Sequence, residues 1–379
     1  MAKGRPVPAD RTTLRHARRL VIKLGSAVLA PEGRLDQSSL ERLAGQIVPL
    51  VADGVAVTVV SSGAVASGFR ALGFDAPPTS IVHKQSAAAV GQPRLMAAWA
   101  EAFGEHGVTV AQALYTAEDL ATRPRYLNTR RTLAELLSRG VVPIVNENDT
   151  TSFDEIKLGD NDRLSALTAD LVDAELLLIL STAKGLYENG DPNRVIPEVR
   201  VTDRTASRNV TADKTSTGTG GMATKLSAAG TAAKWGIATV VAGGREPGII
   251  QRVLAGETVG TLFLPGDRAA RARKRWLGAA ARTAGVVLVD AGAAKAIVGQ
   301  NGSLLPTGVV AVRGAFGRND VVEIAGPDGR VIARGVTAYD SEEVGRLAGK
   351  KTRQIGATLG YCLCDEIVHR SDLVLEGGQ

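Results

Sequence analysis

Two lysines have chemically unusual surroundings in this sequence. Lys23 interrupts the apolar run LVIKL at residues 20–24, and Lys225 closes the glycine-rich stretch TGTGGMATK at residues 217–225. Burying an unpaired lysine is costly, so Lys23 either reaches solvent from the end of a strand or faces an anion. Two ammonium groups beside a transferring phosphoryl group would neutralise the charge on its oxygens. The pair of lysines therefore indicates phosphoryl transfer. For Lys23 alone, the simpler interpretation is a lysine that reaches solvent from the end of its strand.

The glycine-rich stretch before Lys225 offers backbone N–H groups to an anion. Thr219, Gly220 and Gly221 could bring several of these groups close to a phosphate at the start of a helix. The stretch is not a Walker loop, because the chain contains no G-x-x-x-x-G-K-[ST], and no G-x-G-x-x-G follows the first strand. A flexible glycine loop explains the same residues, so the stretch alone leaves both interpretations open.

Acidic and amide side chains gather after the apolar run at residues 141–145, which is the fourth predicted strand. Taken singly, such residues cap helices and turns. Taken together, they could hold an ammonium group, orient the two lysines and coordinate Mg²⁺ through phosphate oxygens and water. The cluster consists of Asn146, Asn148, Asp149, Asp160, Asn161 and Asp162.

Ser62 and Gly63 follow the apolar run at residues 55–60, which is the second predicted strand. A hydroxyl and backbone donors at this place suit a substrate carboxylate, whereas a strand-to-helix turn that needs a small residue is the structural alternative. The chain has no H-E-x-x-H and no G-x-S-x-G, and His83 and His106 have no evident catalytic partner. Hydrolase chemistry is therefore disfavoured.

The elements that must position these residues alternate between short apolar runs and longer helical patterns. This alternation predicts an α/β fold with an open, mainly parallel sheet between helical layers. In such sheets ligands bind beyond the carboxyl ends of the strands, which is where the polar motifs stand. The predicted strands are Leu20–Leu24, Val55–Val60, Val108–Ala113, Val141–Val145, Leu176–Leu180 and Ile237–Val241.

The distribution of charge and composition predicts four segments. Residues 1–19 hold six basic residues and one acidic residue, and residues 268–282 hold six basic residues and no acidic ones. We therefore expect a basic tail over 1–19, the α/β domain over 20–264 and a basic linker over 265–283, with both basic segments solvated. Residues 284–375 contain the short runs VVLVD, GVVAVRG, DVVEIAG and RVIARGVTAY with glycine turns, so they are expected to form a small β-rich domain.

The whole-chain composition limits the class of protein. The 379 residues are 44% hydrophobic and 22% charged, which is typical of globular domains and not of disordered or fibrous chains. No apolar run approaches the length of a membrane span, so a soluble, cytoplasmic protein is expected. Cys362 and Cys364 are too few for a disulfide framework or a structural zinc site.

The motifs VIKLGS, VVSSGAVASG, KQSAAAVGQPRL, VNENDTTSFDEIKLGDNDRLSAL and GTGGMATKLSAA occur in this order. Together they resemble the amino-acid kinase family, and within it the members that phosphorylate glutamate. The segments VDAGAAKAI, SLLPTGV and ARGVTAY resemble a PUA domain, which implies a small barrel. The resemblance covers nearly the whole chain, and the order and spacing of the motifs make it specific.

The resemblance implies transfer of the γ-phosphoryl group of ATP to the side-chain carboxylate of L-glutamate, the first step of proline biosynthesis. Lys23 and Lys225 would stabilise the phosphoryl group, Asp162 would hold both lysines, and Gly25 would donate a backbone N–H. Mg²⁺ would be bound through ATP, without direct protein ligands. The implied glutamate site comprises Asn146, Asp149 (for the α-ammonium group), Asn161, Ser62 and Gly63. The implied ATP site comprises Lys23, Gly25, Ser181, Thr182, Thr219, Gly220, Gly221, Met222, Ala223, Thr224 and Lys225.

The resemblance also implies feedback inhibition by L-proline and a homo-oligomer, either a dimer or a tetramer. Ser181-Thr182 departs from the family pattern, which commonly has a hydroxyl residue followed by Asp at this place. Two alternatives stay open. One is a kinase of the same fold with another acceptor, of which aspartate is the hardest to separate on physical grounds. The other is an RNA-binding protein that uses the PUA-like domain and the basic linker on an inactive kinase scaffold.

Overall fold

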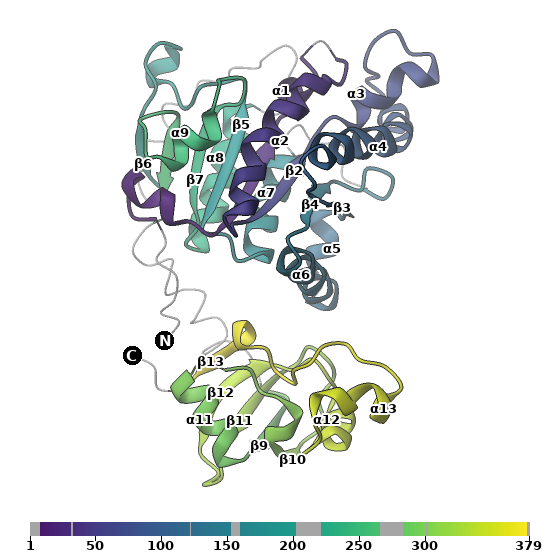
Figure 1. Ribbon diagram of the computed structural model, residues 1–379, viewed down its shortest axis with the longest axis vertical. Helices are drawn as coiled ribbons and strands as arrows, with labels where there is room; N and C mark the ends of the chain where they lie inside the picture. The colour runs from purple at the N-terminus through teal and green to yellow at the C-terminus, as the bar shows by residue number, and fades with distance from the viewer. Residues whose placement is uncertain are drawn as a thin grey trace. The chain divides into compact units, whose positions relative to one another are not determined.

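The computed structural model describes residues 8–376 apart from residues 32, 122, 153–159, 202–220, 266–282 and 301. The chain divides into two compact units, one within Pro6–Ala269 and the other within Ala270–Gln379 (Figure 1). Most of the predicted basic linker lies outside the described residues.

The first unit is built on an eight-stranded sheet with the order β3-β4-β2-β1-β5-β7-β8-β6. All six predicted strands are confirmed to within two residues, and every described pairing among them is parallel. Two further strands of three and four residues were not predicted, because such short runs show no clear pattern; β8 is antiparallel to β7. The strands are β1 (Arg19–Leu24), β2 (Ala56–Ser61), β3 (Val110–Leu114), β4 (Val142–Asn146), β5 (Leu176–Ser181), β6 (Glu198–Arg200), β7 (Ala238–Gly243) and β8 (Thr261–Leu264).

Helices cover both faces of this sheet, so the predicted α/β architecture is confirmed (Figure 1). One apolar core joins alternate strand residues to α1 (Ser26–Leu29), α2 (Gln37–Ala52), α3 (Ala64–Gly68), α4 (Ile81–Gly104) and α9 (Ile249–Leu254). The other joins the intervening strand residues to α5 (Ala117–Ala121), α6 (Arg123–Ser138), α7 (Asp160–Leu171) and α8 (Met222–Lys234). Two cores on opposite faces follow from the alternation of side chains along each strand.

Residues 8–19 belong to the folded unit and not to a solvated tail, so this part of the prediction is wrong. Arg11–His16 form a short 3₁₀ helix capped by Asp10, and Leu14 within it is fully buried. The guanidinium of Arg11 donates to the carbonyl oxygens of Glu257 and Val259, both at 2.9 Å. Charge alone suggested a tail because these bonds to backbone carbonyls leave no trace in the composition.

The second unit has its own sheet, with the order β10-β9-β11-β12-β13, and its own apolar core. One of the predicted glycine turns joins a hairpin: β11 and β12 pair antiparallel, the N–H of Gly326 donates to Arg330 O at 2.9 Å, and Gly329 has a φ of +75°. The elements are β9 (Gly285–Val289), α11 (Ala291–Gln300), β10 (Val309–Arg313), β11 (Val321–Ala325), β12 (Val331–Val336), α12 (Ser341–Leu347), α13 (Ile355–Leu359) and β13 (Leu373–Leu375).

Candidate active site

The position of Lys23 follows from the strand order. It lies near the carboxyl end of β1, level with Val60 of β2 on one side and Ile179 of β5 on the other. Because side chains alternate along a strand, Lys23 shares the face of Val21, which packs in the core beneath α7 and α8. The ammonium group is therefore directed toward these two helices between the β2 and β5 halves of the sheet.

Asp162, in the first turn of α7, joins Lys23 to Lys225 in the first turn of α8. The Nζ atom of Lys23 lies 2.6 Å from Oδ1 of Asp162, and Nζ of Lys225 lies 3.3 Å from Oδ2. The hydroxyl of Thr224 donates to the same Oδ2 at 2.7 Å. The exposed fraction is 6% for Lys23, 4% for Lys225 and 0% for Asp162. The structure thus brings together the three residues predicted to carry the reaction.

The electrostatics of this cluster favour an anionic ligand. Burial by itself would raise the pKa of Asp162, but the charges of Lys23 and Lys225 outweigh it and the net pKa lies below the ordinary value. Burial, aided by the charge of Lys23, lowers the pKa of Lys225 against the opposing effect of Asp162. Two ammonium groups and one carboxylate leave one positive charge in excess, which a phosphoryl group would balance.

A second polar cluster lies on the β2 side of Lys23 and consists of amide side chains. The Nδ2 atom of Asn161 donates to Oγ of Ser62 at 3.0 Å and to Oδ1 of Asn146 at 3.1 Å. Nδ2 of Asn146 in turn donates to Oε1 of Gln92 at 2.8 Å. The structure therefore joins three predicted substrate-binding residues through side-chain hydrogen bonds, with Gln92 at the end of the chain.

Two atoms of this amide cluster are buried and have no hydrogen-bond partner within the described part of the chain. They are Oδ1 of Asn161, which is an acceptor, and Nε2 of Gln92, which is a donor. Such atoms are rare in folded proteins, because each loses its bonds to water without replacement. A ligand that carries both a donor and an acceptor would satisfy them.

The remaining predicted glutamate-site residues border this cluster at the ends of their strands. Gly63 has a φ of +110° and precedes α3, a left-handed conformation that favours glycine and that allows the chain to turn directly after Ser62. Asp149 is half-buried in the turn that follows β4. Asp160 begins α7, but its side chain lies outside the described residues.

The predicted nucleotide-site residues lie on the β5 side of Lys23, at the end of β5 and the start of α8. Ser181 ends β5, and Thr182 follows it and is exposed. Gly221 is the N-cap of α8, whose first turn contains Met222, Ala223 and Thr224. Thr219 and Gly220 lie outside the described residues.

Gly25, predicted to donate its backbone N–H to ATP, lies directly after β1. Its N–H already donates to the carbonyl oxygen of Leu180 at 3.0 Å. This bond joins the end of β1 to β5 and sets the turn into α1. The role of Gly25 toward ATP stays a prediction.

Two features of the site were not predicted. The bond from Thr224 to Asp162 depends on how α7 and α8 pack, and no local pattern indicates it. Gln92 did have a signal: it lies on α4 in register with Ala88, Leu95 and Trp99, all buried on the apolar face of that helix. A polar side chain in such a stripe indicates a buried polar contact.

Comparison with known proteins agrees with this geometry. Residues 18–243 match the amino acid kinase family, and residues 285–359 match the PUA domain. A glutamate 5-kinase of Trichlorobacter lovleyi is 48% identical over 370 residues, which cover 96% of this chain and 98% of the relative. A glutamate 5-kinase of Myxococcus xanthus is 47% identical and covers 97% of this chain and 99% of its own length. A UMP kinase of Bacillus anthracis superposes with a TM-score of 0.45 at 18% identity, over 66% of this chain and 96% of that one. Because the family match spans more than half of the chain and the relatives align over nearly all of it, the chain belongs to the amino acid kinase family, in its glutamate 5-kinase branch, and carries a PUA domain.

Proposed function

We propose that this protein transfers the γ-phosphoryl group of ATP to the side-chain carboxylate of L-glutamate, which is the first step of proline biosynthesis. The carboxylate oxygen forms a bond to the γ-phosphorus, the bond to the bridging oxygen of ADP breaks, and L-glutamyl 5-phosphate and ADP leave. The observation that carries this proposal is the buried cluster of Lys23, Asp162 and Lys225, which lies between an amide-lined side and a predicted nucleotide side.

The charge of each site residue determines its proposed role. Lys23 and Lys225 neutralise the charge on the transferring phosphoryl oxygens, and Asp162 holds both ammonium groups in place. No general base is required, because the attacking carboxylate is already ionised at neutral pH. Asn161, Asn146 and Ser62 would bind glutamate, with Asp149 facing its α-ammonium group. Ser181, Thr182 and the first turn of α8 would contact ATP.

Mg²⁺ fits this site as a companion of ATP and not as an ion held by carboxylates alone. Both oxygens of Asp162 are engaged, by Lys23 on one side and by Lys225 and Thr224 on the other. The nucleotide phosphates would therefore supply ligands to Mg²⁺, whose charge would offset theirs.

A hydroxylamine trap tests the proposed reaction. The protein is incubated with Mg-ATP, hydroxylamine and either L-glutamate, L-aspartate or N-acetyl-L-glutamate, and both ADP and acyl hydroxamate are measured. We expect hydroxamate with glutamate and its loss in Lys23→Ala. Hydroxamate with aspartate alone would change the acceptor, and no turnover with any acid would favour the RNA-binding scaffold.

Four finer properties accompany this proposal. We expect inhibition by millimolar L-proline in the same assay and a dimer or tetramer by light scattering. RNA binding by the PUA domain would require nanomolar affinity at physiological salt in a filter-binding series. The cytoplasm remains the predicted compartment, because the proposed reaction consumes ATP. None of the described helices has the length and apolar character needed to cross a membrane.

A further inference from the structure

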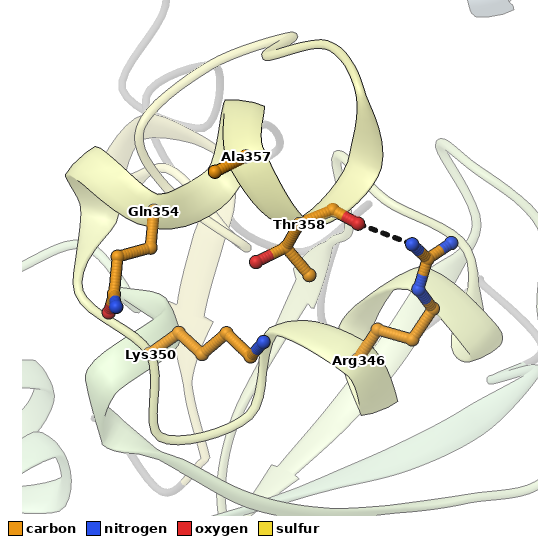
Figure 2. Close-up of a pocket in the computed structure, with 5 residues that line it drawn as sticks. All are labelled: Arg346, Lys350, Gln354, Ala357 and Thr358. Atoms are coloured by element: carbon orange, nitrogen blue, oxygen red, sulfur yellow. Dashed lines mark hydrogen bonds between the residues drawn. The ribbon is translucent and has the colours of Figure 1, made fainter.

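A hollow in the C-terminal unit is lined by hydrogen-bond donors. It measures about 560 Å³ and lies between the end of α12, the following turn and α13 (Figure 2). Its lining consists of Arg346, Lys350, Gln354, Ala357 and Thr358. The volume falls within the range of small-molecule sites, roughly 300–1,000 Å³.

Hydrogen bonds within the lining engage two of its acceptor oxygens and leave several of its donor groups available to a ligand. Arg346 donates to the carbonyl oxygen of Thr358, which holds the guanidinium at the edge of the hollow (Figure 2). The Oε1 atom of Gln354 accepts the N–H of Lys351 at 2.8 Å, so the donor end of that amide remains available. No ion pair or hydrogen bond of the Lys350 ammonium occurs within the described part of the chain. The lining thus offers two cations, an amide donor and a hydroxyl.

The segment that lines the hollow carries charge of one sign. Residues 344–360 contain four basic residues, Arg346, Lys350, Lys351 and Arg353, and no acidic residue. The nearest acid on α12, Glu343, is paired with Arg318 and accepts a bond from Tyr361; these contacts outweigh its burial and lower its pKa to about 2. Glu342, the other acid of α12, is exposed one turn before Arg346, so the charge that an anion would meet in the hollow itself comes from Arg346 and Lys350, and none of the five lining residues is acidic.

We propose that this hollow binds a small molecule carrying a phosphate group. Phosphate matches a guanidinium, an ammonium and neutral donors better than a carboxylate does, because it accepts more hydrogen bonds around one centre. The volume exceeds that of one phosphate ion, and the methyl group of Ala357 gives the remainder an apolar contact. This site goes beyond the proposed phosphoryl transfer, because all its residues belong to the PUA unit.

Calorimetric titration of the full chain with inorganic phosphate and with ribose 5-phosphate tests this proposal. Lys350→Gln removes one of the two cations that line the hollow, and Lys351→Gln removes the same charge from the adjacent exposed residue, which does not line it. We expect saturable binding that is weakened about tenfold or more in Lys350→Gln and little changed in Lys351→Gln. Binding should persist in Lys225→Ala, which separates the hollow from the kinase site.

Three results would overturn the proposal. One is the absence of saturable binding in the wild-type chain up to about 10 mM ligand, well above the millimolar range of weak specific sites. Another is equal weakening of phosphate binding in Lys350→Gln and Lys351→Gln, which would indicate nonspecific attraction to the positively charged surface. The last is RNA oligonucleotide binding through both lysines with no binding of either small phosphate.

A second inference concerns Gln92 and rests on the proposed function. Its side chain is 8% exposed; Oε1 is held by Asn146, whereas Nε2 is buried and without a partner among the described residues. Asn161 lies at the other end of the hydrogen-bonded series Gln92–Asn146–Asn161. Its Oδ1 atom is a buried acceptor that also has no partner among the described residues. An amino acid carries an acceptor and a donor as carboxylate and ammonium. We infer that Gln92 donates to a carboxylate of the glutamate substrate.

Two substitutions separate binding from structural support. Gln92→Met removes the donor, and Gln92→Glu keeps an acceptor for Asn146 while replacing the donor with a negative charge. Both should raise KM for glutamate about tenfold or more and leave KM for ATP unchanged. Gln46→Met is the control, because Gln46 is equally buried at 8% and instead accepts the N–H of Ile250.

The outcomes distinguish this inference from the proposed function. A wild-type glutamate KM in Gln92→Glu, with active enzyme, would show that Gln92 only supports Asn146. An unchanged glutamate KM in Gln92→Met would refute any binding role. If the wild-type chain makes no acyl phosphate from glutamate, the proposed function itself is refuted, independently of the role of Gln92.

Discussion

At the residue scale, the site depends on one carboxylate that serves two cations. Asp162 binds Lys23 through one oxygen and Lys225 through the other, while Thr224 bonds to the second oxygen as well. A fully buried carboxylate with three partners has little freedom to turn, so it holds the two ammonium groups in place. This preorganisation is what electrostatic stabilisation of a transferring phosphoryl group requires.

Removal of either lysine should slow turnover. Lys23→Ala and Lys225→Ala are each expected to lower kcat by about 10² or more, as does removal of a preorganised donor in other enzymes. Lys234→Ala is the control, because Lys234 is exposed in the last turn of the same helix as Lys225. Near wild-type kcat in either site variant, measured by ADP release, would refute the assigned roles.

The lowered pKa of Lys225 predicts an alkaline limit to activity. As pH rises through this pKa, the free enzyme loses the positive charge that receives the phosphoryl group, so kcat/KM for ATP should begin to fall below pH 10.5, the ordinary value for lysine. Bound phosphates favour the charged ammonium, so kcat should fall at a higher pH. Lys225→Arg should move the limit upward, because a guanidinium stays charged. An unmoved limit in that variant would assign the titration to another group.

Asp149 should affect substrate binding more than chemistry. Asp149→Asn removes the carboxylate proposed to meet the α-ammonium group, so KM for glutamate should rise while KM for ATP, the internal control, stays constant. Initial rates over a glutamate series measure both constants. Unchanged glutamate dependence would mean that another residue binds the ammonium group.

At the element scale, the strand order brings the two halves of the site together. β1 lies between β2, which leads to the amide cluster, and β5, which leads to the predicted nucleotide contacts. Helices α7 and α8 then supply Asp162 and Lys225 from one face. A single lysine on β1 can thus face a phosphoryl group that passes between the two halves.

The close approach of α3 and α4 gives a prediction at this scale. A Cβ atom on Gly91 would lie 1.8 Å from Ala64 O and 2.6 Å from Gly68 N, so Gly91→Ala must push α3 away from α4. We expect a loss of about 1–3 kcal/mol or more in the free energy of unfolding. KM for glutamate should rise as well, because α3 follows Ser62 and Gly63 directly.

Gly45→Ala is the matched control for this substitution. Gly45 lies inside α2, and its added Cβ meets nothing within 4 Å. Alanine there should stabilise the helix by about 0.5–1 kcal/mol. Denaturant unfolding measures both variants, and equal effects of the two would contradict the packing argument.

At the scale of the whole molecule, the two units have separate apolar cores. Leu347 is fully buried in the core of the C-terminal unit. Leu347→Ala should lower the stability of that unit by about 2–5 kcal/mol and leave the unfolding transition of the kinase unit in place. Calorimetry resolves the two transitions, and an equal shift of both would show that the units unfold as one.

Much of this molecule could be predicted from its sequence because the relevant signals are local. The apolar runs of β1 to β5 and β7 predicted their strands to within two residues, since strands buried on both faces must be continuously apolar. Lys23 could be selected because a lysine in an apolar strand conflicts with burial unless it meets an anion. Lys225 could be selected because it follows a glycine-rich stretch, and the role of Asp162 was implied by the resemblance to the amino-acid kinase family.

Other features depended on contacts between distant segments. The folding of residues 8–19 rests on Arg11 reaching carbonyls more than 180 residues away, such as that of Glu257. The bond from Gly25 to Leu180 depends on the neighbouring strand, and the contact between Gln92 and Asn146 depends on the position of helix α4. The sequence by itself determined the fold class and the chemical groups of the site, because apolar periodicity and residue type are local properties. Only the tertiary structure decided which of those groups are already paired and which remain available to a ligand, because pairing depends on strand order and helix packing.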